Sequence, residues 1–153
     1  MLVCAALVAN DQLIKLFAIN GLSLRIPVIP GLFYLTYVEN RGAAFGIFQG
    51  HTVALAIISI TLMAVLLAAV LTNKIKENAL IWSAALILAG GIGNCIDRLY
   101  RGFVVDYLDF RAILGFPVFN FADCCVVTGT FIAVIYIILL DRKKTSAPRA
   151  PGD

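Results

Sequence analysis

The sequence predicts an all-α integral membrane protein: four transmembrane helices with a small extracytoplasmic β-containing element and a short loop helix. The first observation is composition. Of 153 residues, 61% are hydrophobic and only 14% are charged, whereas soluble domains carry roughly 45–50% apolar and 25% charged residues. The second is that the apolar residues gather in runs long enough to cross a bilayer. A chain of this length forms one domain, which we place at residues 1–144.

Four runs have the length that a bilayer core of about 30 Å requires of a helix. They predict spans at about 1–19, 52–72, 79–96 and 121–140. A cleaved signal peptide would begin with a basic region, but the first run has no Lys or Arg ahead of Asp11, so we expect an uncleaved span. Residues 145–153, with two prolines, are expected to form a disordered cytoplasmic tail.

The stretch between the first two runs cannot span a membrane. Pro27, Pro30 and Gly31 interrupt any helix. Residues 32–38 (LFYLTYV) are rich in aromatic and β-branched side chains, which favour a strand. We therefore predict a short strand or hairpin at the membrane interface, with its tyrosines at headgroup depth.

The distribution of charge suggests an orientation and excludes one function. Residues 73–78 and the C-terminal end hold six Lys/Arg, which the positive-inside rule places in the cytoplasm. The outer segments hold five arginines, but these are interleaved with acids and could be paired. No basic face with polar support is visible, so nucleic-acid binding is not expected.

The cysteines do not form a metal motif. Cys4, Cys95, Cys124 and Cys125 lie within or beside apolar runs, without a CxxC pair or zinc spacing, and His51 is the only histidine. We expect small buried hydrophobes here, and no metal and no cofactor.

Polar side chains instead gather at one predicted membrane face. Asp11 and Lys15, four residues apart in the order that favours an ion pair, lie near the end of the first span. Asn94, Asp97 and Arg98 lie at the end of the third span, Asp106 in the following outer loop and Asp123 at the start of the fourth span. With four antiparallel spans, all of these arrive at the same end. Ionisable groups at a membrane edge are costly and indicate a functional site.

Asp106 and Asp123 are the candidates for chemistry. Two neighbouring carboxylates cannot both ionise cheaply, so one keeps a proton and the pair offers a base and an acid. Such a pair can hydrolyse a peptide without a metal. Ser/His, Cys/His or Ser/Lys arrangements lack correctly placed partners. The plainer alternatives stay open: Asp106 as a solvated loop acid, and Asp123 as a helix cap.

Several blocks resemble one family, the lipoprotein signal peptidases (signal peptidase II). They are residues 40–45 (NRGAAF), 90–98 (GGIGNCIDR), 102–107 (GFVVDY) and 119–123 (FNFAD), with Asp11 and Lys15 resembling the first-helix block. The blocks occur in the family's order over residues 10–125. Two departures are Tyr107, where Phe is common, and Cys124-Cys125, where a small polar residue usually follows the aspartate.

The resemblance implies a metal-independent aspartyl endopeptidase of the bacterial inner membrane. Such an enzyme removes the signal peptide of prolipoproteins by cleaving before a diacylglyceryl-modified cysteine. It implies Asp106 and Asp123 as the catalytic pair, and as residues that bind substrate or support the pair Asp11, Lys15, Asn40, Gly42, Asn94, Asp97, Arg98 and Asn120. The implied partners are diacylglyceryl-modified prolipoproteins, membrane lipids and globomycin-type cyclic peptide inhibitors, with a monomer acting at the extracytoplasmic face.

Other interpretations accompany this one. A small proton- or cation-coupled transporter would also carry membrane acids, but across the bilayer rather than at one face. A structural membrane subunit would have no purpose for the polar cluster. Asn94 and Asn120 could be helix or turn caps. Asp97 and Arg98 could form a surface ion pair worth under ~1 kcal/mol, or a pair that orients the end of the third helix.

Overall fold

The computed structural model of the chain describes residues 2–43 and 47–145. The long helices are α1 (Leu2–Gly21), α2 (Thr52–Leu71), α3 (Asn78–Tyr100) and α5 (Phe121–Thr145). All four are long and apolar enough to cross a membrane, which confirms the four predicted spans. Of the predicted C-terminal tail, Thr145 ends α5, and residues 146–153 lie outside the described part of the chain.

Two helices are longer than hydropathy predicted. The third span was expected to end at residue 96, but α3 continues to Tyr100, so Asp97 and Arg98 are helical. Likewise α5 runs five residues beyond the expected 140. Hydropathy marks where a chain leaves the bilayer, whereas backbone hydrogen bonding continues through residues that suit a helix in water.

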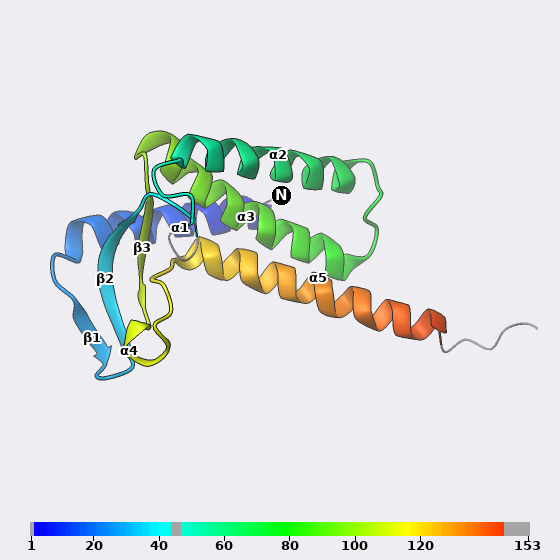
Figure 1. The fold of residues 1–153 in the computed structure, drawn as a ribbon. Coiled ribbons are helices and arrows are strands. Elements are labelled where there is room, and N and C mark those ends of the chain that lie inside the picture. The colour runs from blue at the N-terminus through cyan, green and yellow to red at the C-terminus, as the bar shows by residue number, and fades with distance from the viewer. Residues whose placement is uncertain (1, 44–46, 146–153) are drawn as a thin grey trace, which may run out of the picture.

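A three-stranded antiparallel sheet lies at one end of the helices (Figure 1). Its order is β1 (Ile26–Ile29), β2 (Phe33–Asn40) and β3 (Val104–Asp109), followed by the short helix α4 (Arg111–Leu114). The expected β element and loop helix are therefore confirmed. The expectation that Asp106 lies in a loop is wrong: Asp106 is in the middle of β3, paired with Val38 of β2. Gly102, with φ +77°, turns the chain from α3 into this strand.

Helix α3 is central and packs against α1, α2 and α5. Its closest approach is to α5, where a Cβ on Gly90 would collide with the carbonyl oxygen of Ala122. Farther along the same interface, the hydroxyl of Ser83 donates to the carbonyl of Gly129 at 2.6 Å. Small residues thus let two backbones meet where no hydrophobic effect drives helices together. This contact fixes the start of α5 relative to the end of α3.

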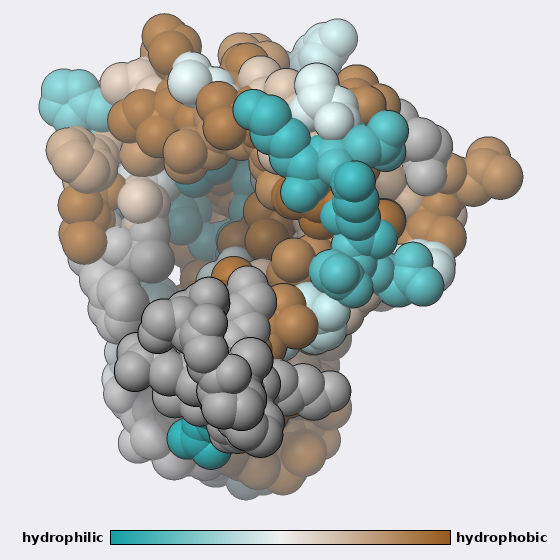
Figure 2. All heavy atoms as spheres, turned by 90° about the vertical axis from the view of Figure 1, so that its right-hand side faces the viewer, coloured by the Kyte–Doolittle hydropathy of each residue, from teal (hydrophilic) through white to brown (hydrophobic). Residues whose placement is uncertain are grey.

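The surface agrees with a membrane environment. Figure 2 shows the end of the bundle that carries the α2–α3 loop: hydrophobic residues cover most of what is visible, and hydrophilic residues gather over part of that end. Lys74, Lys76 and Glu77 of this loop are exposed. The polar end residues and apolar sides match four helices placed across a bilayer.

The Gly90 contact gives a first prediction. Gly90→Ala should lower the stability of the purified protein in detergent by about 1–3 kcal/mol, because the new Cβ must push α5 away from α3. Gly21→Ala is the matched control, since a Cβ there meets only Phe17 at an ordinary 3.6 Å. Thermal unfolding should separate the two variants clearly. Equal melting temperatures would mean that the α3–α5 interface is not this tight.

Candidate active site

The polar residues predicted to converge do so where α1, α3 and α5 meet β3. A cavity of about 710 Å³ opens here, between β2, the chain before α5 and the first turns of α5. Five of the sequence-predicted residues line it: Asn40, Asn94, Arg98, Asp106 and Asp123. Asp11, Lys15, Asp97 and Asn120 are buried behind or beside it.

The start of α5 positions Asp123. Asn120 is the residue before the helix, and its side-chain oxygen accepts a hydrogen bond from the backbone N–H of Asp123 at 2.9 Å. In return, Oδ2 of Asp123 accepts from the backbone N–H of Asn120 at 3.2 Å. This reciprocal pair is a capping box, with Asn120 as the cap and Asp123 three residues on. The helix cap considered for Asp123 is therefore wrong, because Asp123 is the third residue after the cap, whereas the cap considered for Asn120 is confirmed. Asn94 lies within α3 and does not cap a helix.

Asp123 also faces the site, because its second oxygen is not used by the cap. Oδ1 accepts from the side-chain amide of Asn94 at 2.7 Å. Asp106 is held in the same way from two sides: by Asn40 of β2 at 2.9 Å and by Asn120 at 2.7 Å. Asn120 thus contacts both candidate carboxylates, which joins β3 to α5 at the cavity.

Burial changes the acidity of Asp106. The pKa of its carboxyl is raised from 3.8 to about 7, first because burial disfavours the charged form and second because Asp123 carries like charge. Hydrogen bonds from Asn40 and Asn120 oppose the rise. Near neutral pH this carboxyl can therefore hold or release a proton.

The ammonium of Lys15 fixes the orientation of the Asn94 side-chain amide. It donates to Oδ1 of Asn94 at 2.9 Å, and Asn120 donates to the same oxygen at 3.1 Å. Since an ammonium has no acceptor, Asn94 must present its oxygen to Lys15 and its NH₂ to Asp123. Both amides consequently act as donors to the carboxylate pair.

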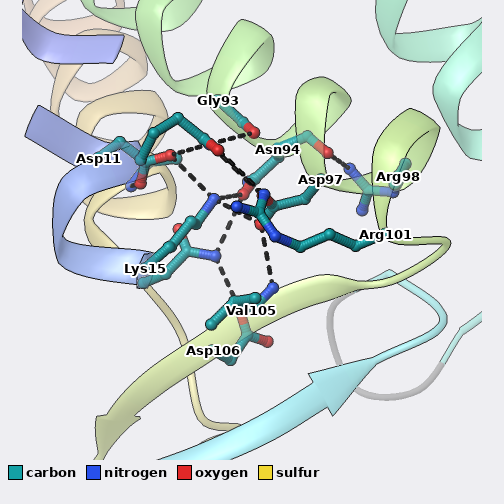
Figure 3. Close-up of polar contacts among 12 residues, drawn as sticks. Asp11, Lys15, Gly93, Asn94, Asp97, Arg98, Arg101, Val105 and Asp106 are labelled. Atoms are coloured by element: carbon teal, nitrogen blue, oxygen red, sulfur yellow. Dashed lines mark hydrogen bonds and ion pairs between the residues drawn. The ribbon is translucent and has the colours of Figure 1, made fainter. Parts of the chain in front are cut away.

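Lys15 has 0% side-chain exposure and forms ion pairs at 2.9 Å with Asp11 and with Asp97 (Figure 3). The predicted Asp11–Lys15 ion pair is confirmed. It lies within the polar site and is not an isolated salt bridge at a helix end. Asp97 is fully buried, and its Oδ2 also accepts from the backbone N–H of Val105 at 3.0 Å. Because Val105 precedes Asp106, Asp97 ties the end of α3 to the strand that carries Asp106.

The suggested surface pair of Asp97 and Arg98 is wrong. Asp97 pairs with Lys15 and with Arg101, one helical turn further on. Arg98 turns instead toward the cavity and donates to the carbonyl oxygens of Asn94 at 3.4 Å and Gly42 at 3.3 Å. Its Nε has no partner among the described residues.

Gly42 is explained by close backbone packing. A Cβ at this position would lie 2.8 Å from the carbonyl oxygen of Ile47. The N–H of Gly42 donates to the side-chain oxygen of Asn40 at 3.0 Å, which turns the Asn40 amide toward Asp106. The rest of this block, residues 44–46, lies outside the described part of the chain.

Sequence reasoning missed several contributors. Gln12 donates to Asp11 and Asp97 and to the carbonyl of Gly93, and Arg101 donates to Gln12 and Asp97. The i,i+4 spacing of Asp97 and Arg101 was visible in the sequence, but the helix was expected to end before it.

Two further side chains secure the start of α5. The hydroxyl of Tyr107, the residue that departs from the family pattern, accepts from the backbone N–H of Phe121 at 3.1 Å. Oδ1 of Asp11 accepts from the next N–H, that of Ala122, also at 3.1 Å. A close approach of α1 to α3 makes this possible, since a Cβ on Gly93 would collide with the Asp11 carboxylate. The first amides of α5 are thereby satisfied from β3 and α1.

The donors around Asp106 and Asp123 are amide N–H groups, with the Arg98 guanidinium nearby; such groups hold anions rather than metal ions. Among residues 2–43 and 47–145, three or more His, Cys, Asp or Glu side chains do not come together as metal ligands would. The chemistry that these side chains offer is proton transfer between two carboxyl groups.

The fold and site together define a multi-pass membrane protein with a buried two-carboxylate site at one end of its bundle. The family model described as signal peptidase (SPase) II matches residues 3–139. The chain therefore belongs to the signal peptidase II family, and it is a peptidase of the bacterial membrane.

Individual relatives agree. The chain is 39% identical over 148 residues to the lipoprotein signal peptidase of Clostridium acetobutylicum, covering 94% of this chain and 96% of the relative. It is 41% identical over 146 residues to that of Clostridioides difficile, with 94% and 97% covered. A solved structure described as a bacterial membrane enzyme, determined by the in meso method at 2.3 Å resolution, superposes with a TM-score of 0.84 at 28% identity. That match covers 99% of this chain and 93% of the other.

The buried ammonium gives the second prediction. Lys15→Met should cost about 3–5 kcal/mol of stability, because Asp11 and Asp97 would stay buried without this cation. Lys74→Met, at an exposed position in the α2–α3 loop, removes the same charge and should change stability by less than ~0.5 kcal/mol. Thermal unfolding in detergent measures both. A Lys15→Met protein as stable as Lys74→Met would contradict the proposed role of the ion pairs.

Proposed function

We propose that this protein is an aspartyl endopeptidase that removes the signal peptide from prolipoproteins, cleaving before the diacylglyceryl-modified cysteine. One observation carries the proposal: Asn120 holds both carboxyl groups beside a cavity. Its side-chain amide donates to Asp106, and its side-chain oxygen accepts from the backbone N–H of Asp123. Family membership and the names of the relatives support the substrate class.

In the proposed mechanism the two carboxyl groups share one proton. The ionised member takes a proton from a water molecule held between them, and the water oxygen attacks the scissile carbonyl. The protonated member donates to the carbonyl oxygen as negative charge develops there. The departing amine then receives a proton from the pair. Asp106, with a pKa near 7, can fill either role, and the pair titrates as a unit.

The cavity suits a substrate that lies partly in the lipid. Its lining continues from Asp123 along α5 through Cys124 to Val127 and Thr128, and Val127 is largely exposed on the apolar side of the bundle. Acyl chains attached to the substrate cysteine would follow this face into the bilayer while the peptide bond stays beside the carboxylates. Globomycin-type cyclic peptides would occupy the same cavity.

The cavity wall opposite α5 is stabilised by contacts between aromatic rings. Phe119 stacks on Phe110 with ring centroids 5.8 Å apart and meets Phe116 edge-on at 5.7 Å. Phe110 in turn stacks on Phe33 of β2 at 4.6 Å. These rings attach the chain before α5 to the sheet, so that the peptide would lie between an aromatic wall and α5.

The charges favour a site on the extracytoplasmic face of the cytoplasmic membrane. Four of the five outer arginines are paired with acids, in the pairs Arg25–Asp109, Arg41–Glu39, Arg101–Asp97 and Arg111–Asp109. Lys74 and Lys76 at the other end are exposed in a basic loop. The positive-inside rule then assigns the α2–α3 loop to the cytoplasm and the sheet to the outside.

A proton- or cation-coupled transporter would need ionisable groups spread across the bilayer. Helix α2 (Thr52–Leu71) contains none, and the buried acids and Lys15 gather at the sheet end of the other helices. Within residues 2–43 and 47–145, no contact favours transport.

The third prediction concerns catalysis. Asp106→Asn and Asp123→Asn should each lower the rate of signal-peptide removal from a diacylglyceryl-modified prolipoprotein by at least about 10³-fold, because an amide cannot exchange the proton. EDTA should leave wild-type cleavage unchanged. Glu77→Gln, in the loop at the other end, serves as the control for removal of one carboxylate. Retained cleavage by either aspartate variant would remove that residue from the mechanism.

The fourth prediction concerns pH. The pair needs one proton, so cleavage should fall as pH rises through about 7, where Asp106 loses its proton. As pH rises, stability should fall before activity does: the folded pKa lies above the unfolded 3.8, so the folded state binds the proton more tightly, and the free energy of unfolding drops as pH rises from about 4 to about 7. Asp106→Asn should therefore be more stable than wild type at pH 8. A less stable variant at that pH would contradict the burial argument.

A further inference from the structure

Outside the cavity, one cluster of charge is not used by the proposed reaction. The carboxylate of Asp109, at the end of β3, has 0% exposure and receives two guanidinium groups: Arg25 at 2.9 Å and Arg111 at 2.8 Å. Both arginines are about half exposed, at 43% and 49%. The pKa of Asp109 is lowered to about 2, mainly by hydrogen bonds from Arg111, so the carboxylate stays ionised. The cluster thus has a net charge of +1 and an open side.

Arg25 is held in place but has donors to spare. Its guanidinium lies over the ring of Tyr34 at 3.7 Å from the centroid, a cation–π contact that orients the group. Only Nε is used on Asp109; among the described residues, its two Nη groups have no hydrogen-bond acceptor. Two guanidinium donors that are oriented and not used within the protein suit a phosphate group.

The strand beside Arg25 is apolar and uncovered. Every residue from 23 to 31 is exposed, and this stretch includes Leu24, Ile26, Val28 and Ile29. β1 is the edge of the sheet, with β2 on one side only. In Figure 1 the hairpin extends sideways past the helix ends rather than over the bundle axis. The hairpin therefore lies at the sheet end of the bundle and to one side of its axis, where a membrane surface would be.

Chain length limits how far this cluster can lie from the end of α1. α1 ends at Gly21 and β1 begins at Ile26, so the intervening chain reaches at most about 17 Å from the end of the span. The headgroup layer adds roughly 5–8 Å to each side of the hydrocarbon core. Arg25, four residues past α1, is thus within reach of phosphate groups, while its apolar neighbours can enter the acyl boundary below them.

We infer that Arg25 and Arg111, held together by Asp109, form a binding site for the phosphate of an anionic phospholipid in the outer leaflet. The exposed residues Leu24 to Ile29 contact the adjoining acyl region. The site differs from the peptide cavity because Asp109 and Arg25 do not line it; Arg111 alone contributes to both. A bound phospholipid would hold the sheet on the membrane and fix Arg111 at the cavity mouth.

Lipid binding to the purified full-length protein in a neutral detergent tests this inference without any activity assay. Native mass spectrometry would measure the affinity for phosphatidylglycerol and, for comparison, phosphatidylcholine. Wild type should prefer phosphatidylglycerol. Arg25→Gln should weaken that binding about five-fold, since one basic residue near an anionic surface contributes about 1 kcal/mol. Arg111 still pairs with Asp109 in this variant.

Two variants complete the test. Arg41→Gln is the matched control: Arg41 is another exposed arginine of the sheet end, 57% exposed and paired with Glu39, and its loss should change affinity less than two-fold. Arg25→Lys keeps the charge beside Asp109 and should retain most binding, which separates charge from folding. Equal losses in Arg25→Gln and Arg41→Gln, or no lipid preference in wild type, would overturn the inference. Competition by millimolar inorganic phosphate would reassign the cluster as a soluble-anion site.

Discussion

An ammonium group buried inside a membrane helix bundle costs several kcal/mol unless its charge is compensated at contact distance. Lys15 meets this requirement with two carboxylates at 2.9 Å and one amide oxygen at 2.9 Å. Its partners come from α1 and α3, and through them it reaches β3 and α5: Asp97 binds the backbone of Val105, and Asp11 binds the backbone of Ala122. The strand with Asp106 and the helix with Asp123 are thus both attached to the acids that Lys15 neutralises.

The same ammonium sets the direction of the hydrogen bond from Asn94, and a backbone N–H sets that from Asn120. Lys15 donates to the side-chain oxygen of Asn94, so the NH₂ group of Asn94 is left to donate to Asp123. Asn120 accepts with its oxygen from the N–H of Asp123, which leaves its NH₂ for Asp106. The two carboxylates thus accept hydrogen bonds from amides whose orientation is set by other contacts. A pre-oriented donor set of this kind needs no rearrangement when charge moves during a reaction.

Much of this arrangement could be predicted from the sequence, because hydropathy and charge placement are strong signals in a membrane protein. Four spans determine which polar residues share a face, so the sequence alone places six of them together: Asp11, Lys15, Asn94, Asp97, Asp106 and Asp123. The partners of Asp97 could not be predicted, because they depend on four more residues of helix and on the turn at Gly102. Asp106 is in a strand because β3 pairs with β2, which lies far earlier in the chain. The local sequence VVDYLD does not reveal this pairing.

The separation of the Lys15 ammonium from the Asp106 carboxyl by two amide side chains is part of the chemistry. An ammonium in direct contact with Asp106 would hold that carboxyl ionised and remove the proton that the proposed mechanism requires. Here the charge of Lys15 acts on Asp106 only as a minor influence that opposes burial, because Asn94 and Asn120 stand between them. Amides stabilise the carboxylates without adding charge, so the pKa of Asp106 can stay near 7. The burial that raises this pKa also weakens the fold at alkaline pH. The ion pairs of Lys15 and the α3–α5 backbone contact stabilise the fold away from the proposed catalytic pair.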